Sequence, residues 1–412
     1  MPKQQAASPR TVAAIAIAAH VLSMAGFSTY AALLPELRDL WGMSNSQAGL
    51  VGGLFFVGYV VTVAYASALT DSMDPRRVYA VGSLFGIAGC AGFGLFADGF
   101  ASAVLFQILA GAGIGATYMP GLRILSDRSS GASQSRYIAF YTSFFGIGMA
   151  LSYALAGMLA PQTGWRGAFI ASALGPLVSG ILVFAGIAAA PRARAARAAF
   201  SLASVFPLAA WRRVLASRAA AGYTAGYAVH CFELFGSRAW MVAFLAFATS
   251  LHASGDSFPW NAAAIAAVVN LFAVPASVLG NEAALRVGRR RWILAVMACS
   301  GVCGIALGFS APWAWWLILL LVTLHTVLVM GDSATLTAGF VAAAPLELRG
   351  AAMGLYSLAG FGGGMLGPAA FGIALDAAGG SGSAAAWVWA YAVTGAGCLA
   401  APFAVRLALS KP

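Results

Sequence analysis

Long apolar stretches alternate with short polar ones along almost the whole chain. Each apolar stretch is close to the roughly 20 residues that an α-helix needs to cross the hydrocarbon core of a bilayer. Charges, glycines and prolines separate one stretch from the next, where turns are expected. The pattern therefore predicts an all-α integral membrane protein with 12 transmembrane helices. The predicted spans are 11–35, 46–69, 78–97, 101–125, 137–160, 167–190, 219–249, 260–285, 292–310, 313–338, 351–376 and 386–405.

The composition indicates the same class of protein. The chain has 412 residues, of which 61% are hydrophobic and 8% are charged. A soluble domain usually has about 25% charged residues, because its surface must be solvated. The first apolar stretch is also longer than the core of a cleavable signal peptide, which has about 7–15 residues. We therefore predict a multi-pass protein of the cell (inner) membrane.

The basic residues identify the cytoplasmic side. Of the 23 Lys and Arg residues, 20 fall at the chain ends and in the even-numbered connections between the predicted spans. Cytoplasmic loops carry an excess of Lys and Arg, so both termini are predicted to be cytoplasmic. The three exceptions are Arg38, Arg166 and Arg238. The net charge of +11 then reflects membrane topology, and we expect no nucleic acid as a partner.

The two halves of the sequence resemble each other. The segment that begins at His20 in the first span aligns with the one that begins at His230 in the seventh. Internal repeats of this kind are typical of secondary transporters. The predicted organisation is a pair of pseudo-symmetric six-helix halves, 1–190 and 219–412, joined by a central cytoplasmic loop at 191–218. The second part of that loop is interpreted either as an interfacial helix or as a simple linker.

The seventh span carries the most unusual group of residues. His230, Glu233 and Arg238 lie within nine positions of an apolar segment. Together with Tyr227 they fall on one helix face about 140° wide. Ionisable side chains inside a membrane span usually face a bundle interior or a water-filled path. We predict that Glu233 carries a proton and that Arg238 binds an anionic substrate group or acts in gating. The alternative is a mutually satisfied pair that only holds the two halves together.

Other predicted spans contribute fewer polar side chains. His20 occupies the position in the first half that His230 occupies in the second, and His325 lies in the middle of the tenth span. A single histidine in a membrane helix is also consistent with a simple hydrogen bond between helices. The complete predicted substrate and proton pathway consists of Glu233, Arg238, His230, His20, His325, Asn270, Gln107 and Tyr227.

The loop after the second span carries a family resemblance. Residues 67–77 read Ser-Ala-Leu-Thr-Asp-Ser-Met-Asp-Pro-Arg-Arg, in which Leu69, Asp71 and Arg76 match the Gly-x-Leu-Ala-Asp-Arg-x-Gly-Arg-Lys/Arg pattern of the major facilitator superfamily. The second half has a related sequence, Arg-Val-Gly-Arg-Arg-Arg, at 286–291. With twelve predicted spans in two halves and both ends inside, the chain resembles that superfamily over essentially its whole length.

The resemblance implies alternating access, in which the two halves rock about a central site and the loop after the second span stabilises one state. It also implies that Asp71 contacts the opposite half and that Arg76 and Arg77 lie at the cytoplasmic face. The alternative for the two arginines is anchoring by the positive-inside rule alone. Asp332 is predicted to pair with Arg349, Arg136 or Arg123 in a gate on the cytoplasmic side, and the alternative for this residue is contact with the substrate. The predicted cytoplasmic gate consists of Asp71, Arg76, Arg77, Asp332, Arg123, Arg136 and Arg349.

Several classes of protein lack their motifs here. The only lysines are Lys3 and Lys411, so there is no Walker lysine for ATP hydrolysis, and no His-Glu-x-x-His motif occurs. The five cysteines lie in apolar segments and do not have the spacing of a zinc site. We therefore predict that the protein is not an enzyme and has no cofactor, no bound metal and no structural disulfide.

The combined pattern predicts a secondary active transporter that moves a small solute by alternating access. Glu233 favours proton coupling, and Arg238 favours an anionic or carboxylate substrate. The alternatives are an uncoupled facilitator and a proton-driven exporter of drugs or metabolites. We expect the partners to be a small-molecule substrate, protons and the lipid bilayer, and we expect the protein to be a monomer.

Overall fold

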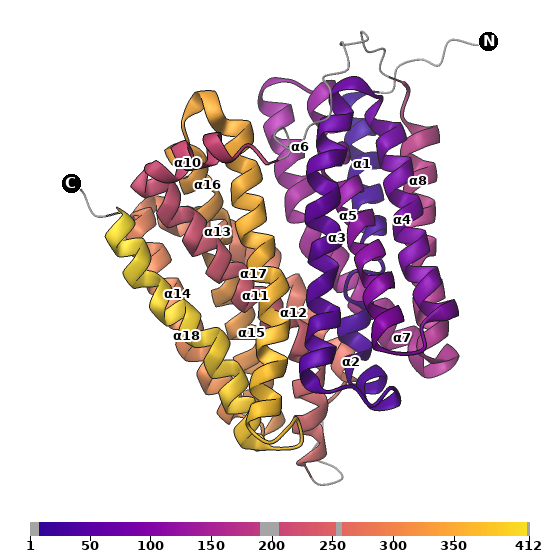
Figure 1. Ribbon diagram of the computed structural model, residues 1–412, viewed down its shortest axis with the longest axis vertical. Helices are drawn as coiled ribbons and strands as arrows, with labels where there is room; N and C mark the ends of the chain where they lie inside the picture. Colours follow the sequence, from indigo (N-terminus) through magenta and orange to yellow (C-terminus); the bar gives the residue numbers. More distant parts are fainter. Residues whose placement is uncertain (1–7, 190–205, 253–257, 410–412) are drawn as a thin grey trace. The chain divides into compact units, whose positions relative to one another are not determined.

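The computed structural model describes residues 8–189, 206–252 and 258–409, and it consists of α-helices joined by short turns (Figure 1). No strand occurs among these described residues. The all-α class predicted from the sequence is therefore confirmed.

The helix bounds follow the predicted spans. In the first half of the sequence the helices are α1 (Pro9–Ser23), α2 (Thr29–Leu40), α3 (Asn45–Ser72), α4 (Pro75–Phe96), α5 (Phe100–Arg128), α6 (Gly131–Ser143), α7 (Phe145–Ser172) and α8 (Leu174–Gly186). In the second half they are α10 (Leu208–Ala216), α11 (Arg218–Ser250), α12 (Ala262–Leu271), α13 (Ala273–Val287), α14 (Arg289–Phe309), α15 (Trp315–Gly331), α16 (Ser333–Ala343), the short 3-10 helix η1 (Leu346–Leu348), α17 (Arg349–Ala377) and α18 (Ala384–Leu409).

The lengths of these helices agree with a multi-pass membrane protein. In the described part of the chain, nine helical stretches are long and apolar enough to cross a membrane. Two shorter apolar helices, Pro9–Ser23 and Ala384–Ala400, add to them. The count of twelve crossings stays a prediction.

Five predicted spans are each divided between two helices. The first breaks at 24–28, between α1 and α2, the fifth at Phe144 and the sixth at Ala173. The eighth breaks at Phe272, and the tenth breaks at Asp332. Hydrophobic periodicity does not predict these breaks, because the apolar character continues through them. A break frees backbone carbonyl groups for other partners. At the break at Asp332 the Gly331 carbonyl accepts a hydrogen bond from Trp292 Nε1 at 2.8 Å.

The fifth and sixth predicted spans, 137–160 and 167–190, lie in or overlap one apolar stretch of 51 residues, Arg136–Gly186. Inside this stretch, within α7, Gly164 has a φ of 69° and a ψ of 172°, which are not helical. Glycine adopts a positive φ easily because it has no Cβ. The interruption falls in the predicted connection between spans 137–160 and 167–190.

The starts of α4 and α11 are set by capping side chains. Asp74 accepts a hydrogen bond from the backbone N–H of Arg76, and Pro75 occupies the first turn of α4. Ser217 accepts one from the N–H of Ala220 at the start of α11. Such caps satisfy N–H groups that the first turn of a helix otherwise leaves without partners.

The chain forms two compact units. Unit 1 contains Met1–Tyr30 and Leu54–Val205, and unit 2 contains Ala31–Gly53 and Phe206–Pro412. Unit 2 therefore includes α2 and the start of α3, although both come from the first half of the sequence. The predicted halves at 1–190 and 219–412 stay a prediction, and residues 190–205 of the predicted central loop lie outside the described residues.

The described end of the predicted central loop is the short helix α10. Its Trp211 is buried, and the indole Nε1 donates a hydrogen bond to the carbonyl of Ala351 on α17 at 2.9 Å. Arg212 and Arg213 are exposed. This distribution of apolar and basic side chains suits a helix at a membrane surface, and that location stays a prediction.

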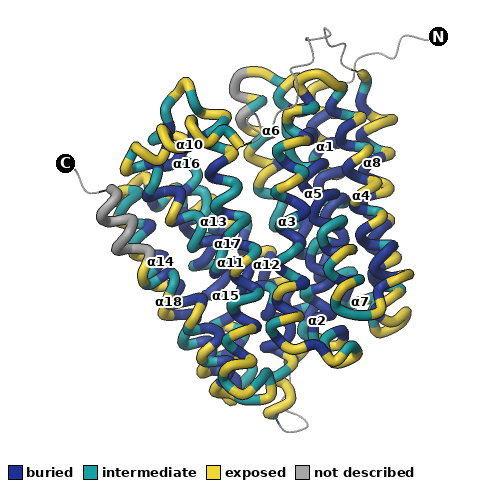
Figure 2. Tube along the Cα trace, viewed as in Figure 1, coloured by how far each residue is buried: buried dark blue, intermediate teal, exposed yellow. Residues whose placement is uncertain are grey.

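Helix α11 is the most enclosed of the long apolar helices (Figure 2). Of the 18 consecutive residues that make up its most apolar part, 78% are buried, whereas the corresponding share is 39% to 56% in the other long helical stretches. Within unit 2 it packs against α16, α17 and α18. In unit 1, helices α1, α4, α5 and α8 lie side by side (Figure 1). The polar side chains of α11 are therefore held away from lipid.

Helices α14 and α18 approach each other through two glycines. A Cβ on Gly301 would lie 2.6 Å from the carbonyl oxygen of Gly395, and a Cβ on Gly395 would lie 2.6 Å from that of Gly301. Small residues permit this close backbone contact between membrane helices. The position of α18 against α14 thus depends on the absence of side chains at these two residues.

The five cysteines are free thiols. Cys299 on α14 is exposed, and so are Val302 and Phe309 on the same helix. The buried cysteines are Cys90, Cys231, Cys303 and Cys398. Because the exposed neighbours of Cys299 are apolar, we expect this surface of α14 to contact lipid.

Candidate functional site

A buried carboxylate lies at the centre of unit 2. Glu233 on α11 is 2% exposed. Its Oε1 atom lies 3.3 Å from Nε2 of His325 on α15. Its Oε2 atom accepts hydrogen bonds from Ser300 Oγ on α14 and from Cys398 Sγ on α18, the latter at 2.9 Å. Four helices therefore hold one carboxylate whose basic partner is a histidine.

A second histidine–carboxylate pair lies close by in the same unit. His230 Nδ1 lies 2.8 Å from Asp332 Oδ1, and both side chains are buried. His230 is one helical turn before Glu233 on α11, and Asp332 sits at the break between α15 and α16. The ring of Tyr227 stacks on His230 at 5.9 Å and on Tyr356 of α17 at 4.1 Å, which restricts the orientation of the imidazole.

Arg238 and Asn270 are the other predicted pathway residues of unit 2. Arg238 is 5% exposed and follows Glu233 by five positions on α11. Asn270, near the end of α12, is fully buried. Its Nδ2 donates a hydrogen bond to the carbonyl of Ala266 at 2.8 Å, while its Oδ1 has no hydrogen-bond partner among the described residues. Both side chains thus place polar atoms inside an apolar unit.

The predicted pathway residues of unit 1 are His20 and Gln107. His20 on α1 is 1% exposed and stacks on Tyr141 with 4.4 Å between ring centroids. A second ring, that of Tyr118, contacts His20 edge to face with 5.3 Å between the ring centroids. His20 Nε2 has no hydrogen-bond partner within the described chain. Gln107 on α5 is also buried. Unit 1 therefore combines a buried ring nitrogen with aromatic surfaces.

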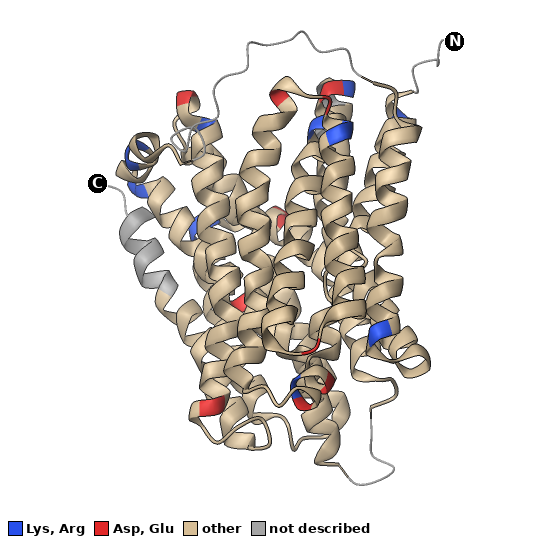
Figure 3. Ribbon diagram, turned by 45° about the vertical axis from the view of Figure 1, so that its right-hand side comes forward, with Lys and Arg blue, Asp and Glu red and all other residues tan. Residues whose placement is uncertain are grey.

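Most charged residues lie near the ends of the helices (Figure 3). One predicted gate residue, Asp71, forms an ion pair with Arg123 at 3.1 Å within unit 1. Arg123 also pairs with Asp127, one turn further along α5, at 2.9 Å. The sequence reasoning missed Asp127, although its spacing of four residues from Arg123 indicates a contact on one helix face.

A second ionic group of unit 1 surrounds Arg76. Its guanidinium lies 2.7 Å from Asp74 and also donates to the carbonyl of Ile187 at 2.6 Å. Burial disfavours the charged Asp74 carboxylate, but hydrogen bonds from Arg76 outweigh it and hold the pKa of Asp74 below its usual value. Asp74 is one of the positions at which the loop departs from the family pattern, and it supplies the partner of a residue that matches the pattern.

The remaining predicted gate residues are not grouped in this way. Arg77, Arg136 and Arg349 are exposed. The ion-pair partner of Asp332 among the described residues is His230 rather than an arginine. The structure therefore places Asp332 with the histidines of the predicted pathway.

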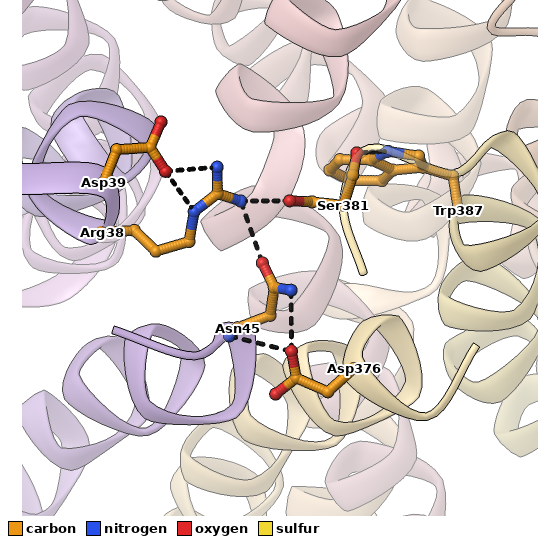
Figure 4. Close-up of polar contacts among 6 residues, drawn as sticks. All are labelled: Arg38, Asp39, Asn45, Asp376, Ser381 and Trp387. Carbon is orange, nitrogen blue, oxygen red and sulfur yellow. Dashed lines mark hydrogen bonds and ion pairs between the residues drawn. The ribbon is translucent and has the colours of Figure 1, made fainter. Parts of the chain in front are cut away.

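A further polar cluster, near the end of α17, was not predicted as a site (Figure 4). Arg38 at the end of α2 contacts Asp39 Oδ1 through Nε at 2.8 Å and through Nη2 at 2.7 Å. Its Nη1 atom donates to Asn45 Oδ1 at 2.9 Å and to Ser381 Oγ. The available signal was that Arg38 is one of three basic residues outside the cytoplasmic set.

Asp376 on α17 completes this cluster (Figure 4). Its carboxylate accepts hydrogen bonds from the backbone N–H and Nδ2 of Asn45, at 3.1 and 2.8 Å. It also accepts them from the backbone N–H and Oγ of Ser46, at 2.7 and 2.5 Å. The start of α3 is thus bound to the end of α17 within unit 2.

A comparison with protein-family models gives a match to the model described as the Major Facilitator Superfamily, over residues 16–235. The matched segment is more than half of the 412 residues. It begins within α1, includes α2 to α8 and ends within α11, two residues after Glu233.

Two curated proteins of Acinetobacter baylyi are similar to part of the chain. The niacin transporter NiaP is 22% identical over 145 residues, which cover 34% of this chain and 32% of that protein. The 4-hydroxybenzoate transporter PcaK is 25% identical over 154 residues, which cover 37% of this chain and 33% of that protein. The matches therefore span less than half of either relative.

Solved structures match over nearly the full length. A bacterial homolog of the human lysosomal transporter Spinster, in an inward-facing and unoccupied conformation, has a TM-score of 0.74 and 15% identity, covering 97% of this chain and 95% of that one. A D-xylose-proton symporter has a TM-score of 0.73 and 15% identity, covering 97% of both chains. At this identity the likeness shows the fold alone. All four similar proteins are named as transporters or symporters, in agreement with the prediction that the chain is not an enzyme.

Proposed function

Because the chain belongs to the major facilitator superfamily, we propose that it is a secondary active transporter that moves a small solute by alternating access and couples this movement to protons. The observation that carries the proposal is the environment of Glu233. This carboxylate is buried in the most enclosed helix of unit 2, and its basic partner is a histidine. The halves that rock are 1–190 and 219–412.

Glu233 has the contacts expected of a group that takes up and releases a proton. Removing a charge from water costs free energy, which the partners of a buried carboxylate must offset. An imidazole partner, unlike a guanidinium, is able to give up its proton, so such a pair can hold different numbers of protons. Ser300 and Cys398 are neutral donors to the carboxylate. They hold the side chain in place and carry no charge of their own.

An uncoupled facilitator is the first alternative. Ionisable residues inside a membrane are costly to retain, and facilitated diffusion of a solute needs no buried titratable pair. The Glu233–His325 contact therefore favours coupling. A proton-driven exporter is the second alternative, and it would use the same pair with the solute moving in the opposite direction.

The proposed substrate is a small organic anion that carries a carboxylate. Arg238 is a buried cation on the same helix as Glu233, and guanidinium groups bind carboxylates through two parallel hydrogen bonds. The relatives are named for niacin and 4-hydroxybenzoate, which are aromatic carboxylic acids.

The other parts of the proposal concern the membrane and the gate. The distribution of basic residues supports a location in the inner membrane with both termini cytoplasmic. The Asp71–Arg123 ion pair supports a gate on that side. We assign the pathway to Glu233, Arg238, His230, His20, His325, Asn270, Gln107 and Tyr227, and the gate to Asp71, Arg76, Arg77, Arg123, Arg136 and Arg349. The protein is proposed to act as a monomer.

The test is transport by purified protein in proteoliposomes with labelled nicotinate and 4-hydroxybenzoate as probes. An imposed pH gradient should drive accumulation by the wild type. Glu233→Gln should abolish gradient-driven accumulation, because a carboxamide does not exchange a proton, and should retain exchange of labelled for unlabelled solute. Glu282→Gln, at an exposed acid of α13, is the matched control and should behave as the wild type. Full accumulation by Glu233→Gln would overturn the assignment of coupling to this residue.

A further inference from the structure

The His230–Asp332 pair repeats the chemistry of the Glu233–His325 pair. In both, a buried carboxylate has an imidazole as its basic partner, at 2.8 Å in one pair and 3.3 Å in the other. In both, α11 contributes one member and the α15–α16 segment contributes the other. The order is reversed, since α11 supplies the histidine of one pair and the carboxylate of the other.

The basic partner of each carboxylate is an imidazole. His230 forms an ion pair with Asp332, and His325 forms one with Glu233. The titratable groups that face Asp332 from the surrounding helices are His230, Cys231 and Glu233 of α11, Tyr356 of α17 and Cys398 of α18.

The type of basic partner decides whether a buried carboxylate can change its charge. An arginine stays charged at any ordinary pH. Protonating its carboxylate partner would therefore leave a buried cation without compensation, which is strongly destabilising. A histidine can release its own proton instead. Each of the two pairs can therefore gain or lose one proton without leaving a permanent charge unpaired in the membrane.

The two pairs are close enough to influence each other. His230 and Glu233 are three positions apart on α11, which corresponds to about 4.5 Å along the helix axis. Groups that interact at such distances titrate in coupled steps rather than independently. A proton bound at one pair changes the electrostatic free energy of binding at the other.

We propose that the His230–Asp332 pair is a second proton-binding site, so that unit 2 loads two protons in each transport cycle. This inference rests on the proposed proton-coupled transport. It replaces the predicted role of Asp332 in a cytoplasmic gate by a role in coupling. The break at Asp332 contributes because it places the carboxylate at the junction of two helices rather than within a continuous one.

Infrared difference spectroscopy of the protein in lipid nanodiscs tests the inference without a substrate. The C=O stretch of a protonated carboxyl group is followed as the pH is lowered. Two buried carboxyl bands should appear in the wild type. Asp332→Asn should remove one band and Glu233→Gln the other, while Glu282→Gln should leave both. If the Asp332→Asn spectrum equals that of the wild type, Asp332 is not a proton-binding site.

Coupling stoichiometry in proteoliposomes gives an independent readout with nicotinate as the probe. The stoichiometry is read from the pH gradient and the solute gradient at which net transport reverses its direction. The wild type should move two protons per solute. Asp332→Asn and His230→Gln should each move one, and the second variant covers the case in which the first does not fold. One proton per solute in the wild type, unchanged in both variants, would overturn the second site and leave the proposed function standing. No proton movement in the wild type would overturn the proposed function itself.

Discussion

Asp74 is the acidic residue outside the membrane spans whose charge the structure stabilises most clearly. Arg76 donates hydrogen bonds to its carboxylate, and the pKa of Asp74 lies below its usual value. A lowered pKa in the folded protein means that ionised Asp74 stabilises the fold. That stabilisation is complete above the usual pKa of aspartate, about 3.9. It is lost as the pH falls through the lower pKa of the folded protein.

Asp74→Asn should therefore lower the free energy of unfolding at neutral pH by about 1 kcal/mol, as expected for a pair near water. The difference from the wild type should shrink as the pH approaches the lowered pKa of Asp74. Thermal unfolding of the detergent-solubilised protein at neutral and acidic pH measures this. Glu36→Gln, at an exposed acid of α2, serves as the control. A difference that is the same at both pH values would contradict the linkage.

Single residues were predictable where their chemistry conflicts with their surroundings. His230, Glu233 and Arg238 are prominent because ionisable groups are rare inside apolar segments. Their partners were less accessible. His325 was placed on the pathway, yet Ser300 and Cys398 were missed, because a hydroxyl or a thiol in a membrane helix is common and carries no distinctive signal. The partner of Asp332 was expected among arginines, since sequence distance does not show which side chains meet in space.

At the level of helices, the contact of α14 with α18 gives a sharp prediction. Gly301→Ala should destabilise the protein by about 1–3 kcal/mol, because the added Cβ would overlap the carbonyl oxygen of Gly395. Gly354→Ala on α17 is the matched control, since a Cβ there meets no described atom within 4 Å. Alanine is also the better helix former, by up to about 1 kcal/mol.

The midpoints of thermal unfolding of the two purified variants measure this contrast. The midpoint should fall for Gly301→Ala and should stay the same or rise for Gly354→Ala. Equal midpoints would show that α18 can move away from α14 without loss, and the backbone contact would then not determine how the two helices pack.

Helices as elements were predictable, and their interruptions were not. A stretch of about 20 apolar residues identifies a span because of the thickness of the bilayer. At the break at Asp332 the Trp292 indole donates a hydrogen bond to the Gly331 carbonyl of a neighbouring helix. The break at Phe272 lies one turn before Pro275, which has no N–H to donate. Gly164 is different, because glycine is itself a signal for a turn and the interruption lies where a connection was expected.

For the whole molecule, the Arg38–Asp376 cluster has the widest consequence. Arg38 and Asn45 come from the first half of the sequence, whereas Asp376 and Ser381 come from the second. Under the proposed alternating access, the halves 1–190 and 219–412 move against each other. The cluster must then open and close again in every cycle, so its hydrogen bonds contribute to the free-energy difference between the states.

Asp376→Asn should loosen this connection. Hydrogen bonds to a charged group contribute about 1.5–3 kcal/mol. Amide hydrogen exchange in 38–53 should therefore become about tenfold faster or more. Asp39→Asn is the control, because the partner of the Asp39 carboxylate among the described residues is Arg38 and the bonds from Asn45 and Ser46 to Asp376 remain. Unchanged exchange in Asp376→Asn, or equal acceleration in both variants, would exclude the cluster as a latch.

The architecture as a whole followed from composition, periodicity and a short loop pattern, because these reflect the bilayer and the family. The Arg38–Asp376 cluster could not be found in the same way. Asn45 and Ser46 are separated from Asp376 by 330 positions or more, and Arg38 is the one member whose position in the sequence is unusual. Only the folded chain brings their donors and acceptors together.

Cys299 offers a practical consequence of the way α14 is exposed. It lies at the midpoint of Arg289–Phe309 and is the exposed one of five free thiols. Because this surface of α14 is expected to contact lipid, we expect a water-soluble maleimide not to reach Cys299 and a lipid-soluble nitroxide or fluorophore to reach it. The unaltered chain therefore carries its own attachment point for a spectroscopic label in the hydrocarbon layer. Quenching by lipid-borne spin labels would read its depth directly.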